Sequence, residues 1–209
     1  MACYLVTGAA GFIAHHTAKM LLEKGDEVVG LDNMNTYYDV RLKQHRLRDL
    51  KEFSNFTFYQ MDIENLEELE QVFQRHTFDK VINLAARAGV RYSMSNPHVY
   101  LSTNATGTLN ILTMILKHGI SGMVLASTSS LYAGQPMPFT ENLPVNTPIS
   151  PYAASKKAAE VMAYSYHHLY DLSICILRYF TVYGPAGRPD MSIFQFIKKI
   201  DDGVPITLF

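Results

Sequence analysis

Thr7-Gly8-Ala9-Ala10-Gly11-Phe12-Ile13-Ala14 is the stretch that decides the fold of this chain. It follows a short apolar run, Cys3–Val6, that is predicted to be a buried strand, and it leads into a helical pattern over Phe12–Lys24. Gly8 permits a tight turn, and Gly11 lets backbone N–H groups approach a phosphate at the positive end of the helix. A glycine pattern alone is weak evidence, but its place between a strand and a helix at the start of a βαβ unit makes it strong.

Beyond this turn, short β-rich runs alternate with longer helical patterns. The alternation predicts a parallel sheet with helices on both faces. The predicted strands are Cys3–Val6, Glu27–Leu31, Thr57–Gln60, Lys80–Leu84, Met123–Ser127 and Ser173–Tyr179. The predicted helices are Phe12–Lys24, Asp39–Lys51, Asn65–Arg75, Pro97–His118, Pro151–Tyr170 and Ser192–Asp202, and a short apolar run, Pro205–Phe209, follows the last. We therefore expect an α/β fold with a doubly wound, mostly parallel, Rossmann-like sheet.

The composition excludes several classes of protein. A chain of 209 residues, 48% of them hydrophobic, can bury one good-sized core, and a net charge of −1 offers no basic surface for nucleic acid. No apolar run reaches the roughly 18 residues that a membrane span needs, and no signal peptide precedes the first strand. Cys3 and Cys175 lie in apolar runs and are predicted to be buried, reduced thiols. We expect a cytoplasmic protein that uses neither a membrane nor a metal.

An acidic residue ends the second predicted strand, in Leu31-Asp32-Asn33. A carboxylate at this point accepts hydrogen bonds from ribose hydroxyls and repels a 2′-phosphate, which favours NAD over NADP. The alternative is that Asp32 only caps a loop. Asp62-Ile63, after the third strand, is placed to bracket an adenine, although an aspartate that opens a helix is equally well explained as an N-cap.

A tyrosine and a lysine, Tyr152 and Lys156, lie one helical turn apart at the start of a predicted helix. A phenol with a pKa near 10 is a poor base at neutral pH, but a neighbouring ammonium and the positive ring of NAD favour its phenolate form. Chance alone gives roughly half a match to this spacing somewhere in the chain. The alternative to a catalytic pair is a solvated lysine beside a core tyrosine. The position after the fifth strand, where ligands of open α/β sheets bind, favours catalysis.

Hydroxyl side chains end the fifth strand, in Ala126-Ser127-Thr128-Ser129-Ser130-Leu131-Tyr132. A hydroxyl beside the catalytic phenol can bind the reacting oxygen of a substrate and pass its proton along. Serine-rich loops are common, so any one of these hydroxyls could be structural. We predict that Thr128 is the catalytic one.

Taken together, these motifs resemble the NAD-dependent nucleotide-sugar epimerase/dehydratase family of extended short-chain dehydrogenases. The resemblance also includes Leu84-Ala85-Ala86 and Arg178-Tyr179-Phe180, and it covers essentially the whole chain. It implies NAD as the cofactor. The cofactor-binding residues that it implies are Gly8, Gly11, Phe12, Ile13, Asp32, Asn33, Asp62, Ile63, Leu84, Ala85, Ala86, Asn104, Tyr152, Lys156 and Tyr179.

Three stretches resemble the UDP-glucuronate 4-epimerases within that family. They are Asn35–Asp39, Ala88–Ser93 and Phe180–Met191. The resemblance implies epimerisation at C4 of a UDP-sugar through a 4-keto intermediate, with substrate contacts from Arg91, Ser129, Ser130, Thr181 and Arg188. A guanidinium at position 188 suits a carboxylate or a phosphate, and the sequence does not separate the two.

Three other functions compete with this one. A 4-epimerase for UDP-glucose or UDP-N-acetylglucosamine would use the same tyrosine, lysine and threonine. A UDP-glucuronate decarboxylase would favour an arginine near Thr181. Residue 181 is itself a threonine and not that arginine. A non-catalytic NAD-binding module is the third.

The chain also departs from the family pattern. Ser129-Ser130 replaces the Asp-Glu pair of the dehydratases, so the elimination of water lacks its acid. Arg87 stands where glucuronate epimerases more often have glutamine, and Ala133 replaces a glycine. Ala14 stands in place of the third glycine of the turn, and it is small enough to pack closely against the strand.

Family members continue for roughly another hundred residues, the size of a small second domain. We therefore expect residues 1–209 to form the NAD-binding domain, with 180–209 as the start of a substrate-binding part whose remainder is largely absent. By family habit and from the apolar and small residues of Pro97–His118 and Pro151–Tyr170, we expect these two helices to form a homodimer as a four-helix bundle.

Overall fold

A single parallel sheet organises the computed structural model, which describes residues 1–206. Its strands are β1 (Cys3–Thr7), β2 (Glu27–Asp32), β3 (Phe56–Gln60), β4 (Lys80–Asn83), β5 (Gly122–Thr128) and β6 (Ser173–Tyr179). They lie in the order β3-β2-β1-β4-β5-β6, and every neighbouring pair is parallel. The chain reverses its direction of winding between β1 and β4, which is the point where open α/β sheets bind their ligands. The predicted doubly wound fold is confirmed.

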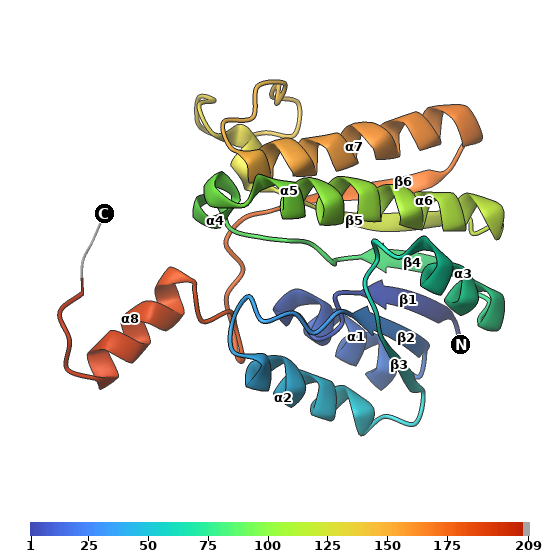
Figure 1. Ribbon diagram of the computed structural model, residues 1–209, viewed down its shortest axis with the longest axis horizontal. Coiled ribbons are helices and arrows are strands. Elements are labelled where there is room, and N and C mark those ends of the chain that lie inside the picture. Colours follow the sequence, from blue (N-terminus) through green and yellow to red (C-terminus); the bar gives the residue numbers. More distant parts are fainter. Residues whose placement is uncertain (207–209) are drawn as a thin grey trace.

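Helices cover both faces of the sheet (Figure 1). The longer ones are α1 (Phe12–Glu23), α2 (Val40–Lys51), α3 (Leu66–Arg75), α6 (Gly107–Lys117), α7 (Pro151–Tyr170) and α8 (Ser192–Asp201). α1 and α2 pack on one face, and α3, α6 and α7 pack on the other. Within the described residues, no helix is long and apolar enough to cross a membrane.

The core consists of two layers that the sheet separates. The larger layer joins Leu5 and Leu125 of the sheet to Ile111 and Ile115 of α6, all of them almost inaccessible to solvent. The smaller layer lies under α1, where Ala14 packs with its neighbours against β1 and β2. The alanine therefore does fill the close-packing position that a glycine usually occupies in the turn.

The predicted helix Pro97–His118 is not one regular helix. It comprises α5 (Pro97–Tyr100), a π-helical stretch η1 (Leu101–Thr106) and α6. Ser102 and Thr103 in the π-helical stretch both donate hydrogen bonds to the carboxylate of Glu64. π-Helical turns are frequent at functional sites, and this one places Asn104 behind the cavity described below. Two short helices, α4 (Val90–Ser95) and the 3₁₀ turn η2 (Ser129–Tyr132), were not predicted.

The prediction of two buried cysteines is wrong. Cys3 is partly accessible and Cys175 is exposed, and both are free thiols. β6 is an edge strand on which exposed and partly buried residues alternate, and Cys175 lies on the exposed face. An apolar run predicts burial on both faces, but an edge strand near the end of the fold is covered on only one.

The segment after β6 leaves the sheet. In Figure 1, α8 stands apart from the strands, and none of its residues is buried. Of the apolar run Pro205–Phe209, Pro205 and Ile206 are irregular, and residues 207–209 lie outside the described part of the chain.

Candidate active site

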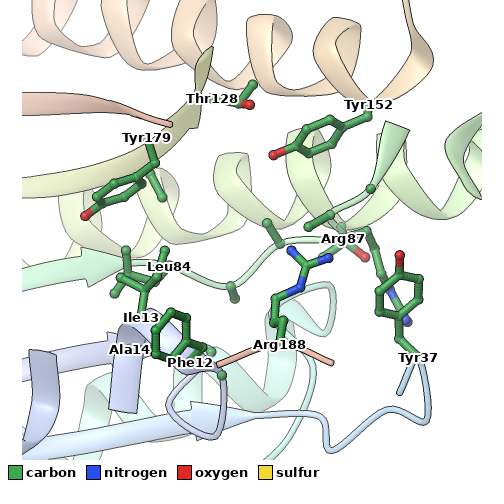
Figure 2. A pocket seen from close by; sticks show the side chains of 18 of the residues that line it. Phe12, Ile13, Ala14, Tyr37, Leu84, Arg87, Thr128, Tyr152, Tyr179 and Arg188 are labelled. Carbon is green, nitrogen blue, oxygen red and sulfur yellow. The ribbon is translucent and has the colours of Figure 1, made fainter. Parts of the chain in front are cut away.

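A cavity of about 710 Å³ lies beyond the carboxyl ends of the strands (Figure 2). All of the predicted site residues line it except Asn104. These are Gly8, Gly11, Phe12, Ile13, Asp32, Asn33, Asp62, Ile63, Leu84, Ala85, Ala86, Arg91, Thr128, Ser129, Ser130, Tyr152, Lys156, Tyr179, Thr181 and Arg188. Residues that are distant in the sequence thus meet at one site, as the topology of the sheet requires.

The glycine turn forms the floor at one end of this cavity. Gly8 has a φ of +72°, and a β-carbon there would come within 3.0 Å of the backbone of Ala85. A β-carbon on Gly11 would lie 2.8 Å from the Gly8 carbonyl oxygen. Only glycine therefore allows the two backbone segments to approach this closely. The resulting cradle of backbone at a helix N-terminus fits a pyrophosphate.

Thr7 ties the ends of β1 and β4 together beside that cradle. Its buried hydroxyl donates to Asn83 Oδ1 at 2.6 Å and accepts from the N–H groups of Leu84 and Ala85 at 3.1 and 3.0 Å. This arrangement satisfies the backbone of the Leu84–Ala86 segment where the strand ends. It holds that segment in the cavity wall beside the glycine turn.

Asp32 lies at the end of β2 and has a cationic partner that the sequence analysis missed. Its carboxylate accepts from the N–H groups of Ala10 and Met34 at 3.2 and 2.8 Å, so it does stabilise the following turn. Lys43 Nζ donates to Asp32 Oδ1 at 3.1 Å, and both side chains are only 6% exposed. The ammonium offsets part of the repulsion that Asp32 alone would exert on a 2′-phosphate. The preference for NAD over NADP is therefore expected to be smaller than Asp32 alone implies.

Arg46, also missed, is fully buried and connects three parts of the cavity wall. Its guanidinium donates to the Ala10 carbonyl at 3.1 Å and to the Tyr38 hydroxyl at 2.6 Å. It also donates to the Ala186 carbonyl, at 2.6 and 3.0 Å. Arg46 thus joins the glycine turn to the loop that precedes Arg188.

A sequence signal for these two cations does exist. Lys43, Arg46, Leu47 and Leu50 are the buried residues of α2, and they follow the i, i+3, i+4, i+7 spacing of one helix face. Two basic residues on the apolar face of a predicted helix indicate buried cations, which need acceptors in the folded protein.

Asp62 does not cap α3. That position belongs to Asn65, whose side chain accepts from the Glu68 N–H at 3.2 Å. Asp62 instead accepts from Asn33 Nδ2 at 2.6 Å and from the Glu64 N–H at 3.1 Å, and it lines the cavity. The N-cap alternative is therefore wrong.

Tyr152 and Lys156 lie in the first turns of α7, which begins with Ser150 as its N-cap and Pro151 in its first turn. Burial lowers the pKa of Lys156 to about 8, and the negative charge of Glu160 opposes that shift. Burial raises the pKa of Tyr152, whereas a hydrogen bond with Thr128 and the charge of Arg188 act in the opposite direction. Burial outweighs these two influences, so the pKa of the Tyr152 phenol lies above its ordinary value. In Figure 2, Thr128 and Tyr152 project into the cavity from one wall and Arg188 projects from the opposite one.

A buried carboxylate, Glu160, holds α7 against the ends of β5 and β6. It accepts from Ser127 Oγ at 2.6 Å and from Arg178 Nε and Nη2 at 2.9 and 3.0 Å. Burial opposes its ionisation, but the hydrogen bonds from Arg178 and Ser127 prevail and hold the pKa of Glu160 below its ordinary value. Because Ser127 precedes Thr128 and Glu160 follows Lys156 by one turn, this contact fixes the catalytic helix relative to the threonine.

Asn104 acts from behind the cavity wall and not within it. It is fully buried, its Oδ1 accepts from the Arg87 N–H at 2.8 Å, and its Nδ2 donates to the Arg87 carbonyl at 3.0 Å. Nδ2 also donates to Ser155 Oγ at 2.9 Å. Asn104 contacts Arg87 and Ser155 in this structure, and its direct contact with a cofactor stays a prediction. The irregular π-helical turn that directs this side chain could not be inferred from periodicity.

The other end of the cavity carries hydroxyls and guanidinium groups. Arg188 Nε donates to Asp190 Oδ1 at 3.0 Å, and the guanidinium carbon lies 5.9 Å from the centre of the Tyr37 ring. Tyr37 was missed, since an exposed-looking Asn-Thr-Tyr-Tyr stretch gives no sign of the partner 151 positions on.

Ala133 has a φ of −57°, which an alanine adopts without strain, so this departure from the family pattern leaves the backbone unaffected. Among residues 1–206, no group of His, Cys, Asp or Glu side chains is placed to hold a metal ion.

The sequence profile of the NAD dependent epimerase/dehydratase family matches residues 4–209. The chain belongs to this family. It is 57% identical over 209 residues to a UDP-glucuronate 4-epimerase of Thermodesulfobacterium geofontis, a match that covers 100% of this chain and 65% of the relative. The chain thus spans about two-thirds of the length of that relative.

Solved structures of family members have the same fold. A UDP-glucuronic acid 4-epimerase of Bacillus cereus, in complex with UDP-glucuronic acid and NAD, superposes with a TM-score of 0.91 at 36% identity, covering 99% of this chain and 65% of the other. A UDP-glucose 4-epimerase of Thermotoga maritima, with UDP-glucose, gives a TM-score of 0.85 at 30% identity, with coverages of 99% and 65%. The Rossmann-like architecture is therefore shared across family members with different sugars.

Proposed function

We propose that this chain binds NAD in the cavity and serves the C4 epimerisation of a UDP-sugar, with UDP-glucuronate as the substrate and UDP-galacturonate as the product. The observation that carries the proposal is the meeting of Thr128, Tyr152 and Lys156 with a glycine cradle in one cavity. The glucuronate epimerases of Thermodesulfobacterium and Bacillus support the choice of sugar.

The described residues fit this cofactor. The turn at Gly8 and Gly11 would hold the pyrophosphate, and Asp32 with Lys43 would face the adenosine ribose. Asp62 and Ile63 would bracket the adenine, and Lys156 would bind the other ribose. When bound, NAD supplies the acceptor and later the donor of the C4 hydride.

The side chains of α7 and β5 manage the proton. Tyr152, as the phenolate, removes the proton of the sugar 4-hydroxyl, and Thr128 hydrogen-bonds the same oxygen. The 4-keto sugar then rotates in the cavity, and the neutral phenol returns this proton to the oxygen. The ammonium of Lys156 stabilises the phenolate, so we expect the rate to fall as the pH rises through about 8, the value to which burial lowers its pKa.

The charges at the substrate end favour a uronic acid over a neutral sugar. Arg87, Arg91 and Arg188 all line the cavity, and guanidinium groups match carboxylates and phosphates in geometry. Ser129 and Ser130 provide hydroxyls but no acid, which disfavours dehydration. A 4-epimerase for a neutral UDP-sugar remains the second candidate, because the Thermotoga enzyme has the same fold with UDP-glucose.

We further propose that residues 180–209 begin the substrate-binding part of the protein, and that α6 and α7 form a homodimer. Apolar side chains exposed on the dimer helices support the second proposal. They include Leu116, Val161, Met162, Tyr164 and Leu169. A single monomeric species in light scattering at micromolar concentration would contradict it.

The decisive experiment follows UDP-galacturonate formation from UDP-glucuronate by NMR. We expect NAD binding but little or no turnover by the 209-residue chain, and turnover once it is joined to the C-terminal third of the Thermodesulfobacterium relative. Mispositioning of a substrate costs orders of magnitude in rate. In the joined protein, Tyr152→Phe is expected to abolish turnover while NAD still binds. Turnover by Tyr152→Phe at the parental rate would remove Tyr152 as the base.

A further inference from the structure

Arg87 is a guanidinium in the cavity wall without a counter-ion. Its Nε is buried and forms no hydrogen bond. No ion pair joins it to any carboxylate within residues 1–206. Two other arginines differ in this respect, because Arg178 pairs with Glu160 and Arg188 pairs with Asp190. A buried polar nitrogen without an acceptor is unfavourable unless a ligand satisfies it.

The backbone of Arg87 is nevertheless held firmly. Asn104 bonds both its N–H and its carbonyl and is itself anchored to Ser155, three residues after Tyr152 on α7. The root of the Arg87 side chain is therefore fixed relative to the proposed catalytic tyrosine. A group fixed in this way and left without a partner is preorganised for a ligand.

The side chain of Arg87 lies on the same side of the cavity as Tyr37 (Figure 2). A β-carbon on Gly89, two residues on, would lie 2.6 Å from the Tyr37 hydroxyl, so the loop packs against this ring. Arg188 contacts the same ring, at 5.9 Å from its centre. The charge of Arg188 is already shared with Asp190, whereas that of Arg87 is not. Arg87 therefore brings to this region a positive charge that has no carboxylate partner among the described residues.

We infer that Arg87 is a specificity-determining residue whose guanidinium binds an anionic oxygen group of the substrate. The inference rests on the proposed function and adds a recognition group to it. A planar guanidinium donates two parallel hydrogen bonds to a carboxylate or to a phosphate. The sugar carboxylate and the nucleotide diphosphate share this chemistry, and three ligands separate them.

The experiment measures the affinity of the NAD-loaded chain for UDP, UDP-glucose and UDP-glucuronate by ligand-observed NMR. Arg87→Gln removes the charge, Arg87→Lys keeps it without the planar fork, and Arg48→Gln on the exposed face of α2 is the matched control. Loss of a hydrogen bond to a charged group weakens binding by roughly tenfold or more. If the carboxylate is the ligand, Arg87→Gln weakens UDP-glucuronate alone by that factor. If the diphosphate is the ligand, all three weaken equally.

In both cases Arg87→Lys is expected to bind between the parent and Arg87→Gln, and Arg48→Gln to match the parent. Unchanged NAD affinity in each variant shows that the cavity is intact. Binding of all three ligands by Arg87→Gln within twofold of the parent would overturn the role of Arg87 and leave the proposed function standing. A parent that binds none of the three, either alone or joined to the C-terminal third of the Thermodesulfobacterium relative, would overturn both.

Discussion

The sheet with its packed helices and the segment that follows β6 differ in how far their side chains are buried and have partners within the chain. In the sheet region, the buried charged side chains of Asp32, Lys43 and Glu160 have partners within the chain. After Tyr179, apolar side chains are largely open to solvent, with Tyr183 73% and Ile200 67% exposed. The first region is thus complete in its packing. The second has an amphipathic helix whose apolar face is not buried within the described residues.

Arg46 is the residue that joins the two regions. It donates to Ala10 in the glycine turn and to Ala186 and Gly187 beyond β6. The loop that carries Arg188 is therefore held at the cavity although the rest of its segment is exposed. The end of the site that carries Arg188 therefore depends on a contact with the end that carries the glycine turn.

The largest expected effect comes from breaking the buried ion pair of the sheet region. Glu160→Gln leaves the charge of Arg178 without its partner, and loss of one member of a buried pair costs about 3–5 kcal/mol of stability. We expect urea denaturation at pH 7 to show a loss of this size. Lys157→Gln is the control, because Lys157 lies 3.7 Å from Glu160 and is more exposed.

Because of the ion pair between Glu160 and Arg178, we expect the folded protein to lose stability in acid. Because the folded-state pKa of Glu160 lies below the ordinary value of 4.5, the pair contributes stability above that pH and loses it as the pH falls through the folded-state pKa. The difference in stability between the parent and Glu160→Gln should therefore shrink below pH 4.5. An unchanged difference at low pH would show that the carboxylate charge contributes nothing.

A smaller effect is expected from cutting the contact between the two regions. Arg46→Met keeps much of the buried volume but leaves the Ala10, Ala186 and Gly187 carbonyls without a donor, which costs about 1–3 kcal/mol. Because these carbonyls lie on both sides of the cavity, the affinities for NAD and for UDP-glucuronate should both fall. Calorimetric titration checks this, and a loss of stability without a loss of either affinity would contradict the joining role.

Asp32 and Lys43, which would face the adenosine ribose, have opposite charges that can be tested separately. Asp32→Ala should weaken NAD binding by about 1–3 kcal/mol, the range for losing hydrogen bonds to a charged acceptor. Lys43→Met should instead widen the preference for NAD over NADP, since Asp32 would then face the 2′-phosphate uncompensated. Titration of both cofactors against each variant gives the ratios. An unchanged ratio in Lys43→Met would show that the ammonium does not offset the carboxylate.

The sequence predicted those parts of the site that are formed by residues close together in the chain. The glycine turn and the Tyr152/Lys156 pair depend on spacing within one turn or one helix, and the order of strands and helices brings them together. Asn104 stays a predicted cofactor residue, and its contacts with Arg87 and Ser155 could not be inferred from periodicity. Lys43 and Arg46 were missed because their spacing on one face of α2 indicates burial but does not reveal their acceptors, which lie outside that helix. Cys175 was predicted to be buried because an apolar run does not reveal that its strand lies at the edge.

The smallest expected effect is that of Ile200→Ala, which is matched with Ile115→Ala in the other region. Ile115 of α6 is fully buried, whereas Ile200 of α8 is 67% exposed. Truncation to alanine removes the same atoms from both, so the difference reports only the surroundings. Ile115→Ala should cost about 2–5 kcal/mol through lost burial and the cavity left behind. Ile200→Ala should stay within about 0.5 kcal/mol in the 209-residue chain, because no core closes over it. If α8 becomes covered in the protein joined to the C-terminal third of the Thermodesulfobacterium relative, Ile200→Ala should become costly there while the cost of Ile115→Ala stays the same. An equal, small effect of Ile200→Ala in both proteins would mean that the exposed apolar face of α8 is not part of a core in either.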